Sequence, residues 1–182
     1  MKRSKLLHLL KMYNPLDSQE QEFKKQIVAF VSTHADCFER SLLEGHITGS
    51  AWLLNQDHSK ALLMHHMKLD RWLQLGGHCD GEADVLAVAV KEAQEESGIM
   101  AIEPLSDSIF DIDVHLIPER LHEPAHYHYD IRFLLHMIHD EKIVQNSESK
   151  ELRWIEKNAQ TLPTDSLSVV RMFHKWAASK RA

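Results

Sequence analysis

The feature that most constrains this sequence is a glycine-rich loop followed by a segment with one acidic and one apolar side. The loop spans residues 75–82, LGGHCDGE, and a helix is predicted over 84–97. Glu92, Glu95 and Glu96 are spaced by three and four residues, which places them on one helical face. The other side is apolar and carries Val85, Val88, Ala89 and Ala93. The segment therefore predicts a helix that packs on a sheet and presents a carboxylate cluster.

The three glutamates repel one another, because like charges at this spacing are destabilising on a helix surface. Lys91, four residues before Glu95, is the local counter-charge. Carboxylate oxygens are the ligands that a hard divalent cation such as Mg²⁺ takes. A solvated acidic face is the alternative for a charge run alone, and the flanking glycines Gly77 and Gly98 favour the cation site.

Residues 77–99 resemble the signature box of the Nudix hydrolases. The family pattern is Gly, five residues, Glu, seven residues, Arg-Glu, an apolar residue, any residue, Glu-Glu, any residue, Gly, apolar. Gly77, Gly98, Ile99 and the three helix glutamates fall in register. The resemblance is specific, because six separated positions match over 23 residues.

Two positions depart from that pattern. Lys91 stands at the arginine position, which keeps the charge but loses the planar fork for bidentate contacts. Ala83 stands at the early glutamate position, with Glu82 one residue ahead of it. We therefore expect the loop to be rebuilt locally.

The resemblance implies a phosphoanhydride hydrolase that uses Mg²⁺ or Mn²⁺. Glu95 and Glu96 would bind the cation, and Glu92 would share the metal site and orient or deprotonate the attacking water. The backbone carbonyl of Gly76 or Gly77 would supply a further ligand, since glycine lets the backbone approach closely.

Two further side chains complete the implied set. Lys91 would hold Glu95 or a phosphate group in place. Family members often recruit an additional glutamate from a later loop, and Glu148 is the nearest candidate, with Glu151 second.

Histidine is unusually frequent, with fourteen in 182 residues. Segments 110–116 and 126–135 alternate between apolar and polar residues, so both are predicted strands. Candidates for a second metal site, or for the lining of a substrate cleft, lie on these polar faces. Others lie near the first strand and beside the paired glycines. The candidates are His46, His78, His115, His126, His128, Asp130 and Arg132. Imidazole and carboxylate together suit Zn²⁺, Mn²⁺ or Fe²⁺ better than Mg²⁺.

The placement of His46 and His78 is similar to that of the metal-binding histidines of type 1 isopentenyl-diphosphate isomerases, which share the Nudix fold. That resemblance implies an acidic pair near residues 126–130. The isomerase reaction fits poorly, because its catalytic cysteine would stand at Gly76, whereas Cys79 lies on the other side of His78.

The order of the predicted elements indicates a single α/β/α sandwich with a mixed sheet, which is also the fold that the resemblance implies. Helices are predicted over 5–13, 18–33, 84–97 and 165–178, and strands over 47–55, 60–67, 110–116, 126–135 and 151–155. Residues 1–43 form a predicted helical extension or the front of the same core, and 44–182 form the predicted Nudix hydrolase domain.

The net charge of −6 argues against nucleic acid as the main partner. Two cysteines make no disulfide framework and favour the reducing cytoplasm. The basic start lacks the small-residue cleavage site of a signal peptide, and no apolar stretch is long enough to cross a membrane. We therefore expect a cytoplasmic protein with a small-molecule diphosphate substrate, no nucleic-acid or membrane partner, and a homodimer as an open alternative to a monomer.

The leading hypothesis is a metal-dependent hydrolase that cleaves a diphosphate linkage in a nucleoside diphosphate derivative or a related small molecule. One alternative is an isopentenyl-diphosphate isomerase-like enzyme of the same fold. Another is a non-catalytic, nucleotide-sensing Nudix module, which Ala83 alone favours. The resemblance implies that specificity resides outside the box, here in residues 117–125 and the N-terminal helices.

Overall fold

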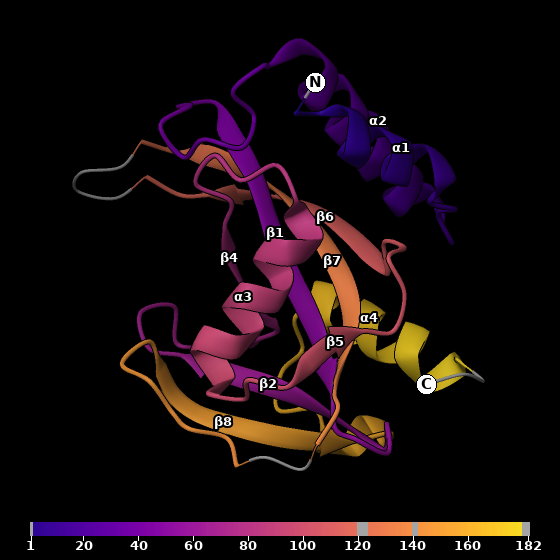
Figure 1. Ribbon diagram of the computed structural model, residues 1–182, viewed down its shortest axis with the longest axis vertical. Helices are drawn as coiled ribbons and strands as arrows, with labels where there is room; N and C mark the ends of the chain where they lie inside the picture. Colours follow the sequence, from indigo (N-terminus) through magenta and orange to yellow (C-terminus); the bar gives the residue numbers. More distant parts are fainter. Residues whose placement is uncertain (1, 120–123, 140–141, 180–182) are drawn as a thin grey trace.

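A computed structural model describes residues 2–119, 124–139 and 142–179 of the chain. Within these residues, eight strands form one curved, mixed sheet with helices on both faces (Figure 1). The strands are β1 (Gly45–Leu54), β2 (Lys60–His66), β3 (Arg71–Leu73), β4 (Leu75–His78), β5 (Ile102–Pro104), β6 (Asp111–Ile117), β7 (His126–Met137) and β8 (Ser149–Glu156). The helices are α1 (Ser4–Met12), α2 (Ser18–Thr33), α3 (Val85–Ser97) and α4 (Leu167–Ala178), with a short 3₁₀ turn at Ala159–Thr161.

The sheet is organised around β1, which is buried along its whole length. Its parallel partner is β7, paired from Gly45↔Tyr127 to Leu54↔His136. Its other edge meets β4 first and then the end of β2, both antiparallel. Strands β5 and β6 extend the sheet beyond β7, and β3 and β8 pair with β2. The predicted mixed sheet is thus present.

The polar segment that carries the paired glycines is only partly a loop. Residues Leu75–His78 form β4 and pair with β1, so the loop begins at Cys79 rather than at Leu75. Gly76 lies opposite Ser50 with φ +151°, and a side chain there would collide with Ser50. The pattern did not predict this strand, because two adjacent glycines weaken strand propensity.

Helix α3 lies against one face of the sheet. Asp84 caps its first turn by accepting a 3.3 Å hydrogen bond from the backbone N–H of Ala87, and Gly98 ends it in the left-handed conformation at φ +74°. The helix approaches β1 closely at Gly49, where a Cβ would lie 2.8 Å from the backbone oxygen of Val85. The predicted box helix is therefore confirmed to within one residue at its start.

Two apolar clusters hold the layers together. Helices α3 and α4 lie on opposite faces of the sheet (Figure 1). Helices α1 and α2 share one cluster with α3, to which they contribute Leu6, Leu10, Ile27, Phe30 and Val31. Helix α4 covers the other face, where Trp176 and Met172 pack with Trp52 of β1. The N-terminal helices thus pack into the main core. The division into residues 1–43 and 44–182 stays a prediction. None of the helices in the described ranges is both long enough and apolar enough to cross a bilayer.

Candidate functional site

The box helix is tied to β4 through its last glutamate. The backbone N–H of Gly76 donates a 2.8 Å hydrogen bond to Oε2 of Glu96, whose residue is only 4% exposed. Burial raises the pKa of Glu96 to about 8; the hydrogen bond from Gly76 opposes this rise, and the charges of Glu92 and Glu148 add to it. A buried carboxyl surrounded by other carboxylates is stabilised in its charged form by a cation.

Glu92 extends over the second glycine of β4. A Cβ on Gly77 would lie 2.5 Å from Oε2 of Glu92, so glycine makes room for this carboxylate. Burial raises the pKa of Glu92. Lys91 Nζ lies 3.4 Å from Oε2 of Glu95 and 3.8 Å from Oε1 of Glu92, which agrees with the predicted positioning of Glu95 by Lys91.

The predicted additional glutamate lies close to the box. Negative charge on Glu148 raises the pKa of both Glu92 and Glu96. The segment before β8 is held in place by the side-chain amide of Asn146, which donates to the backbone oxygen of Glu95 at 3.2 Å, and by the backbone N–H of Met67, which donates to the backbone oxygen of Glu148 at 2.7 Å. Sequence reasoning did not single out Asn146, although an amide two residues before Glu148 is a signal for a loop anchor.

The donor set fits a hard, hydrated cation. It consists of carboxylate oxygens from Glu92, Glu95, Glu96 and Glu148. Among the described residues, Lys91 is the basic side chain that lies within ion-pair distance of Glu92 and Glu95. No three of these four carboxylates bring their oxygens within 4.8 Å of one another. Mg²⁺ usually keeps several of its waters, and those waters bridge to ligands further away.

The early glutamate position of the box has a structural explanation. Ala83 packs against the main core. Glu82 is exposed, and its Oε1 accepts a 2.9 Å hydrogen bond from the backbone N–H of Asp84. The side chain of Glu82 therefore supports the start of the helix, and the local rebuilding of the loop stays a prediction.

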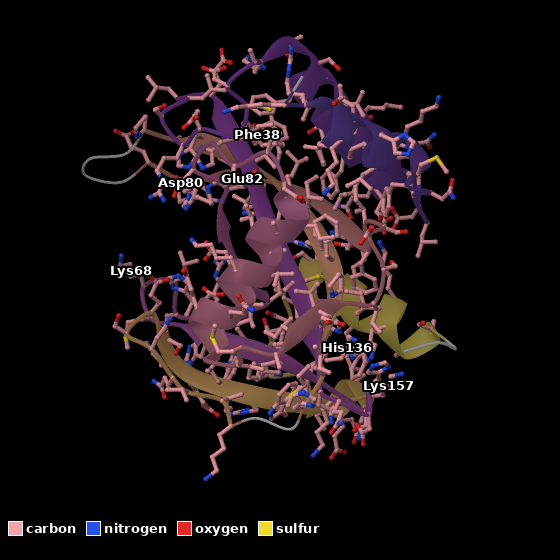
Figure 2. The ribbon with its side chains drawn as sticks, viewed as in Figure 1. Phe38, Lys68, Asp80, Glu82, His136 and Lys157 are labelled. Carbon is pink, nitrogen blue, oxygen red and sulfur yellow. The ribbon has the colours of Figure 1, made fainter. Side chains whose placement is uncertain are left out.

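The turn that follows β4 is anchored to the segment before β1. Asp80 and Gly81 both have positive φ, at +48° and +85°. The guanidinium of Arg40 pairs with the carboxylate of Asp80, and the backbone N–H of Gly81 donates to the backbone oxygen of Phe38 at 3.0 Å. Figure 2 shows Asp80 and Glu82 on this turn beside Phe38.

A histidine group lies at the end of the sheet next to this turn. Ligand nitrogens of His46, His78 and His128 all lie within 4.8 Å of one another. His46 lies inside β1 rather than before it, and is 1% exposed. Burial, followed by the charges of His78 and His126, lowers the pKa of His46 to about 4. Burial and the neighbouring imidazoles lower that of His128 to about 2.

Two other predicted histidines border this group. The ring centroid of His126 lies 5.0 Å from that of His46, and its Nε2 lies 3.2 Å from Nε2 of His128. His115 lies 5.5 Å from His128 between ring centroids, and its Nδ1 is 3.2 Å from the carboxylate of Asp113.

Asp130 and Arg132 do not join the histidine group. Asp130 accepts hydrogen bonds from Thr48 and Ser50 at 2.9 and 2.8 Å and is 2.7 Å from Nε of Arg132. Arg132 is 1% exposed and also pairs with Asp111. The two side chains form a buried network one and two pleats along the strand, so the structure gives them no open position in a substrate cleft.

The two cysteines are buried and free of disulfides. Burial raises the pKa of the Cys79 thiol well above its usual value, and that of Cys37 to about 11. A thiol in this state is a poor nucleophile. The structure thus adds to the argument against isomerase chemistry at Cys79.

Residues 46–173 match the family model described as NUDIX domain. The chain belongs to the Nudix family. The predicted family and fold are confirmed, and membership supports a hydrolase that acts on phosphoanhydrides.

Solved structures of Nudix proteins share the fold. A C. elegans Ap4A hydrolase in a binary complex has 15% identity and a TM-score of 0.58, and covers 72% of this chain and 95% of its own. An E. coli dihydroneopterin triphosphate pyrophosphohydrolase has 16% identity and a TM-score of 0.55, with 72% and 94% covered. An ADP-ribose pyrophosphatase from Streptococcus suis has 20% identity and a TM-score of 0.54, with 75% and 92% covered. Among curated proteins, no sequence matches significantly.

These Nudix structures align with roughly the same fraction of the chain as the family model, which begins at His46. Helices α1 and α2 precede that match. Residues 120–123, which belong to the predicted specificity loop 117–125, lie outside the described residues.

Proposed function

We propose that this Nudix protein is a divalent-cation-dependent pyrophosphohydrolase that cleaves a diphosphate linkage in a nucleoside diphosphate derivative or a related small molecule. The observation that supports it best is the grouping of Glu92, Glu95, Glu96 and Glu148 beside the bare backbone of β4. A sensing module needs no such concentration of like charge, which destabilises the protein unless a cation neutralises it.

Each box side chain has a separate role in this proposal. Glu95 and Glu96 hold Mg²⁺ or Mn²⁺, and Lys91 keeps the exposed Glu95 in position. Glu92, half-buried over Gly77, orients the attacking water and accepts its proton. Glu148 supplies the additional carboxylate. When bound, the cation neutralises charge that develops on the phosphoryl oxygens.

The substrate class is proposed from the same chemistry. The structural relatives are named as enzymes for Ap4A, ADP-ribose and dihydroneopterin triphosphate, which serve as a rational panel. At 15–20% identity these relatives share the fold, so the panel must be tested compound by compound.

The test is release of phosphate, pyrophosphate or a nucleoside monophosphate from that panel with Mg²⁺ and with Mn²⁺. We expect Glu95→Gln to lower kcat by at least about 100-fold, since it removes a carboxylate that stabilises the transition state through the cation. Glu103→Gln is the matched control, because Glu103 is an exposed carboxylate on β5. Equal activity of native protein and Glu95→Gln would refute the proposal, as would turnover without a divalent cation.

Isopentenyl diphosphate belongs in the same panel. Its rearrangement without hydrolysis of any phosphoanhydride would replace the hydrolase proposal with the isomerase-like alternative. We expect no rearrangement, because Gly76 has no side chain and the thiol of Cys79 is buried and protonated.

A further inference from the structure

Four neighbouring strands place histidines on one face at one end of the sheet. His46 of β1 is paired with His128 of β7, and His128 is paired with His115 of β6. His78 of β4 pairs with Thr48, two residues along β1 from His46 and therefore on the same face. The strand register itself gathers these imidazoles, so their proximity does not depend on a flexible loop.

His46 is the least satisfied member of the group. Both of its ring nitrogens are buried and form no hydrogen bond. A neutral imidazole has one N–H donor and one acceptor nitrogen, and burying both without a partner loses the hydrogen bonds that each would make with water. A metal ion bound to one nitrogen would satisfy that atom and offset part of this cost.

The tautomer of His126 is set by a contact with the backbone. Its Nδ1 lies 2.9 Å from the backbone oxygen of Pro124. Because a carbonyl can only accept, Nδ1 carries the proton, and Nε2 is therefore the acceptor in its 3.2 Å hydrogen bond with Nε2 of His128. A hydrogen bond of this kind from the remote nitrogen is the usual support of a metal-bound histidine.

The spacing of two nitrogens also matches a tetrahedral site. Nε2 of His126 and Nε2 of His128 are 3.2 Å apart. With metal–nitrogen bonds of about 2.0–2.1 Å, adjacent nitrogens of a tetrahedral zinc site lie about 3.3 Å apart. The nitrogens of His46, His78 and His128 lie within 4.8 Å of one another, so each pair must approach by up to about 1.5 Å to reach this spacing.

This group is separate from the box carboxylates. Gly77 faces α3, since a Cβ there would meet the carboxylate of Glu92. His78 is the next residue of β4, so its side chain points to the opposite face of the sheet. One face of β4 thus serves the carboxylates and the other serves the imidazoles.

We propose that His46, His78 and His128 bind one divalent transition-metal ion of the Zn²⁺ class, with His126 as the nearest fourth ligand. Three or four neutral imidazoles suit Zn²⁺ and Co²⁺, whereas Mg²⁺ selects oxygen ligands. Among the described residues this is the one set of three or more such side chains whose ligand atoms lie so close together. The proposal does not rest on the hydrolase proposal, because its readout is metal binding rather than turnover.

The experiment is a Co²⁺ titration of the full chain after treatment with a chelator, followed by visible absorption. Co²⁺ bound by three or four nitrogens in a tetrahedral site gives intense d–d bands, which a hydrated carboxylate site lacks. We expect one equivalent to bind with these bands and to be displaced by one equivalent of Zn²⁺. Glu95→Gln removes a box carboxylate and should leave the bands unchanged.

Two independent variants test the ligands. His46→Asn and His128→Gln should each weaken Co²⁺ binding by at least about 100-fold, and His139→Asn, at an exposed histidine, should have no effect. Zn²⁺ should also raise the Tm of the native protein and not that of a ligand variant, since an ion that binds only the folded state stabilises it. If His46→Asn fails to fold, His128→Gln decides.

Three results would overturn the proposal. They are absence of the intense bands in the native protein, bands that persist in His128→Gln, and bands that disappear in Glu95→Gln. The last result would assign the ion to the box carboxylates.

Discussion

The backbone N–H of Gly76 and the carboxylate of Glu96 are joined by a 2.8 Å hydrogen bond that connects β4 to the last turn of α3. The bond fixes the helix against the strand at the point where the carboxylates gather. It also stabilises the charged form of Glu96, against burial and the charges of Glu92 and Glu148, which raise the pKa of this carboxyl. A backbone group of β4 thereby sets the distance between this strand and the carboxylate of Glu96.

Gly77→Ala tests this close approach. The added Cβ would lie 2.5 Å from Oε2 of Glu92, so that carboxylate must move while the strand stays in place. We expect stability within about 0.5 kcal/mol of native, because the displaced atoms are the end of a flexible side chain. We expect kcat to fall about 100-fold, since a displacement near 1 Å has that effect on a positioned group. Unchanged kcat in steady-state assays would show that Glu92 has no positional role.

Thiol reactivity offers a second test. Cys37 and Cys79 are both buried, and burial raises the pKa of each thiol, so the thiolate is scarce at neutral pH. A chromogenic disulfide reagent should find no fast-reacting thiol in the folded protein and two after denaturation. Cys79→Ala should retain hydrolase activity, and loss of activity in a folded Cys79→Ala protein would argue for a chemical role of the thiol.

The buried network behind the histidines should carry a large share of stability. Asp111 is fully buried and accepts hydrogen bonds from Arg132 at 2.9 Å and from Arg171 at 3.0 Å. Asp111→Asn removes a buried negative charge that Arg132 and Arg171 share, although both keep Asp113 as a partner, and we expect a loss of about 3 kcal/mol in the free energy of unfolding. Urea denaturation measures it, with the exposed Asp107→Asn as control. A loss below about 1 kcal/mol would contradict this role.

The lowered pKa of Asp111 also determines how the free energy of unfolding should change with pH. Burial acts against ionisation of Asp111, but the hydrogen bond from Arg171 and the charges of Arg132 and Lys175 outweigh it and hold its pKa below the usual value. A depressed folded pKa means that the stabilisation is complete above the unfolded pKa of about 3.9 and is lost as pH falls through the folded pKa. Unfolding free energy should therefore decline below about pH 4, and less steeply in Asp111→Asn. Parallel slopes would exclude Asp111 as the group responsible.

Sequence patterns predicted the elements whose structure depends on residues close to one another in the chain. The box helix follows from its cap at Asp84, its apolar side and its stop at Gly98, all within one segment. The shared polar face of His126 and His128 follows from strand alternation. The family resemblance singled out Glu148, whose charge raises the pKa of Glu92 and Glu96, and its role in the metal site stays a prediction.

What escaped prediction depends on residues far apart in the chain. The pairing of His46 with His128 requires the parallel register of β1 and β7, which no local pattern encodes. The burial of Asp111 depends on Arg171, sixty residues later, so alternation alone placed this aspartate on a polar face without showing that α4 and α2 enclose it. The strand β4 was hidden by its glycines, which are there for close approach rather than for propensity.

The long parallel pairing of β1 with β7 has a consequence for how the protein is made. Residues 45–54 must wait for residues 126–137 before the centre of the sheet can form, so an apolar strand stays without its main partner while more than seventy residues are synthesised between them. Contacts of such sequence separation fold slowly, and exposed strand edges invite association with other chains. We expect expression at low temperature or with chaperones to improve the yield of soluble protein.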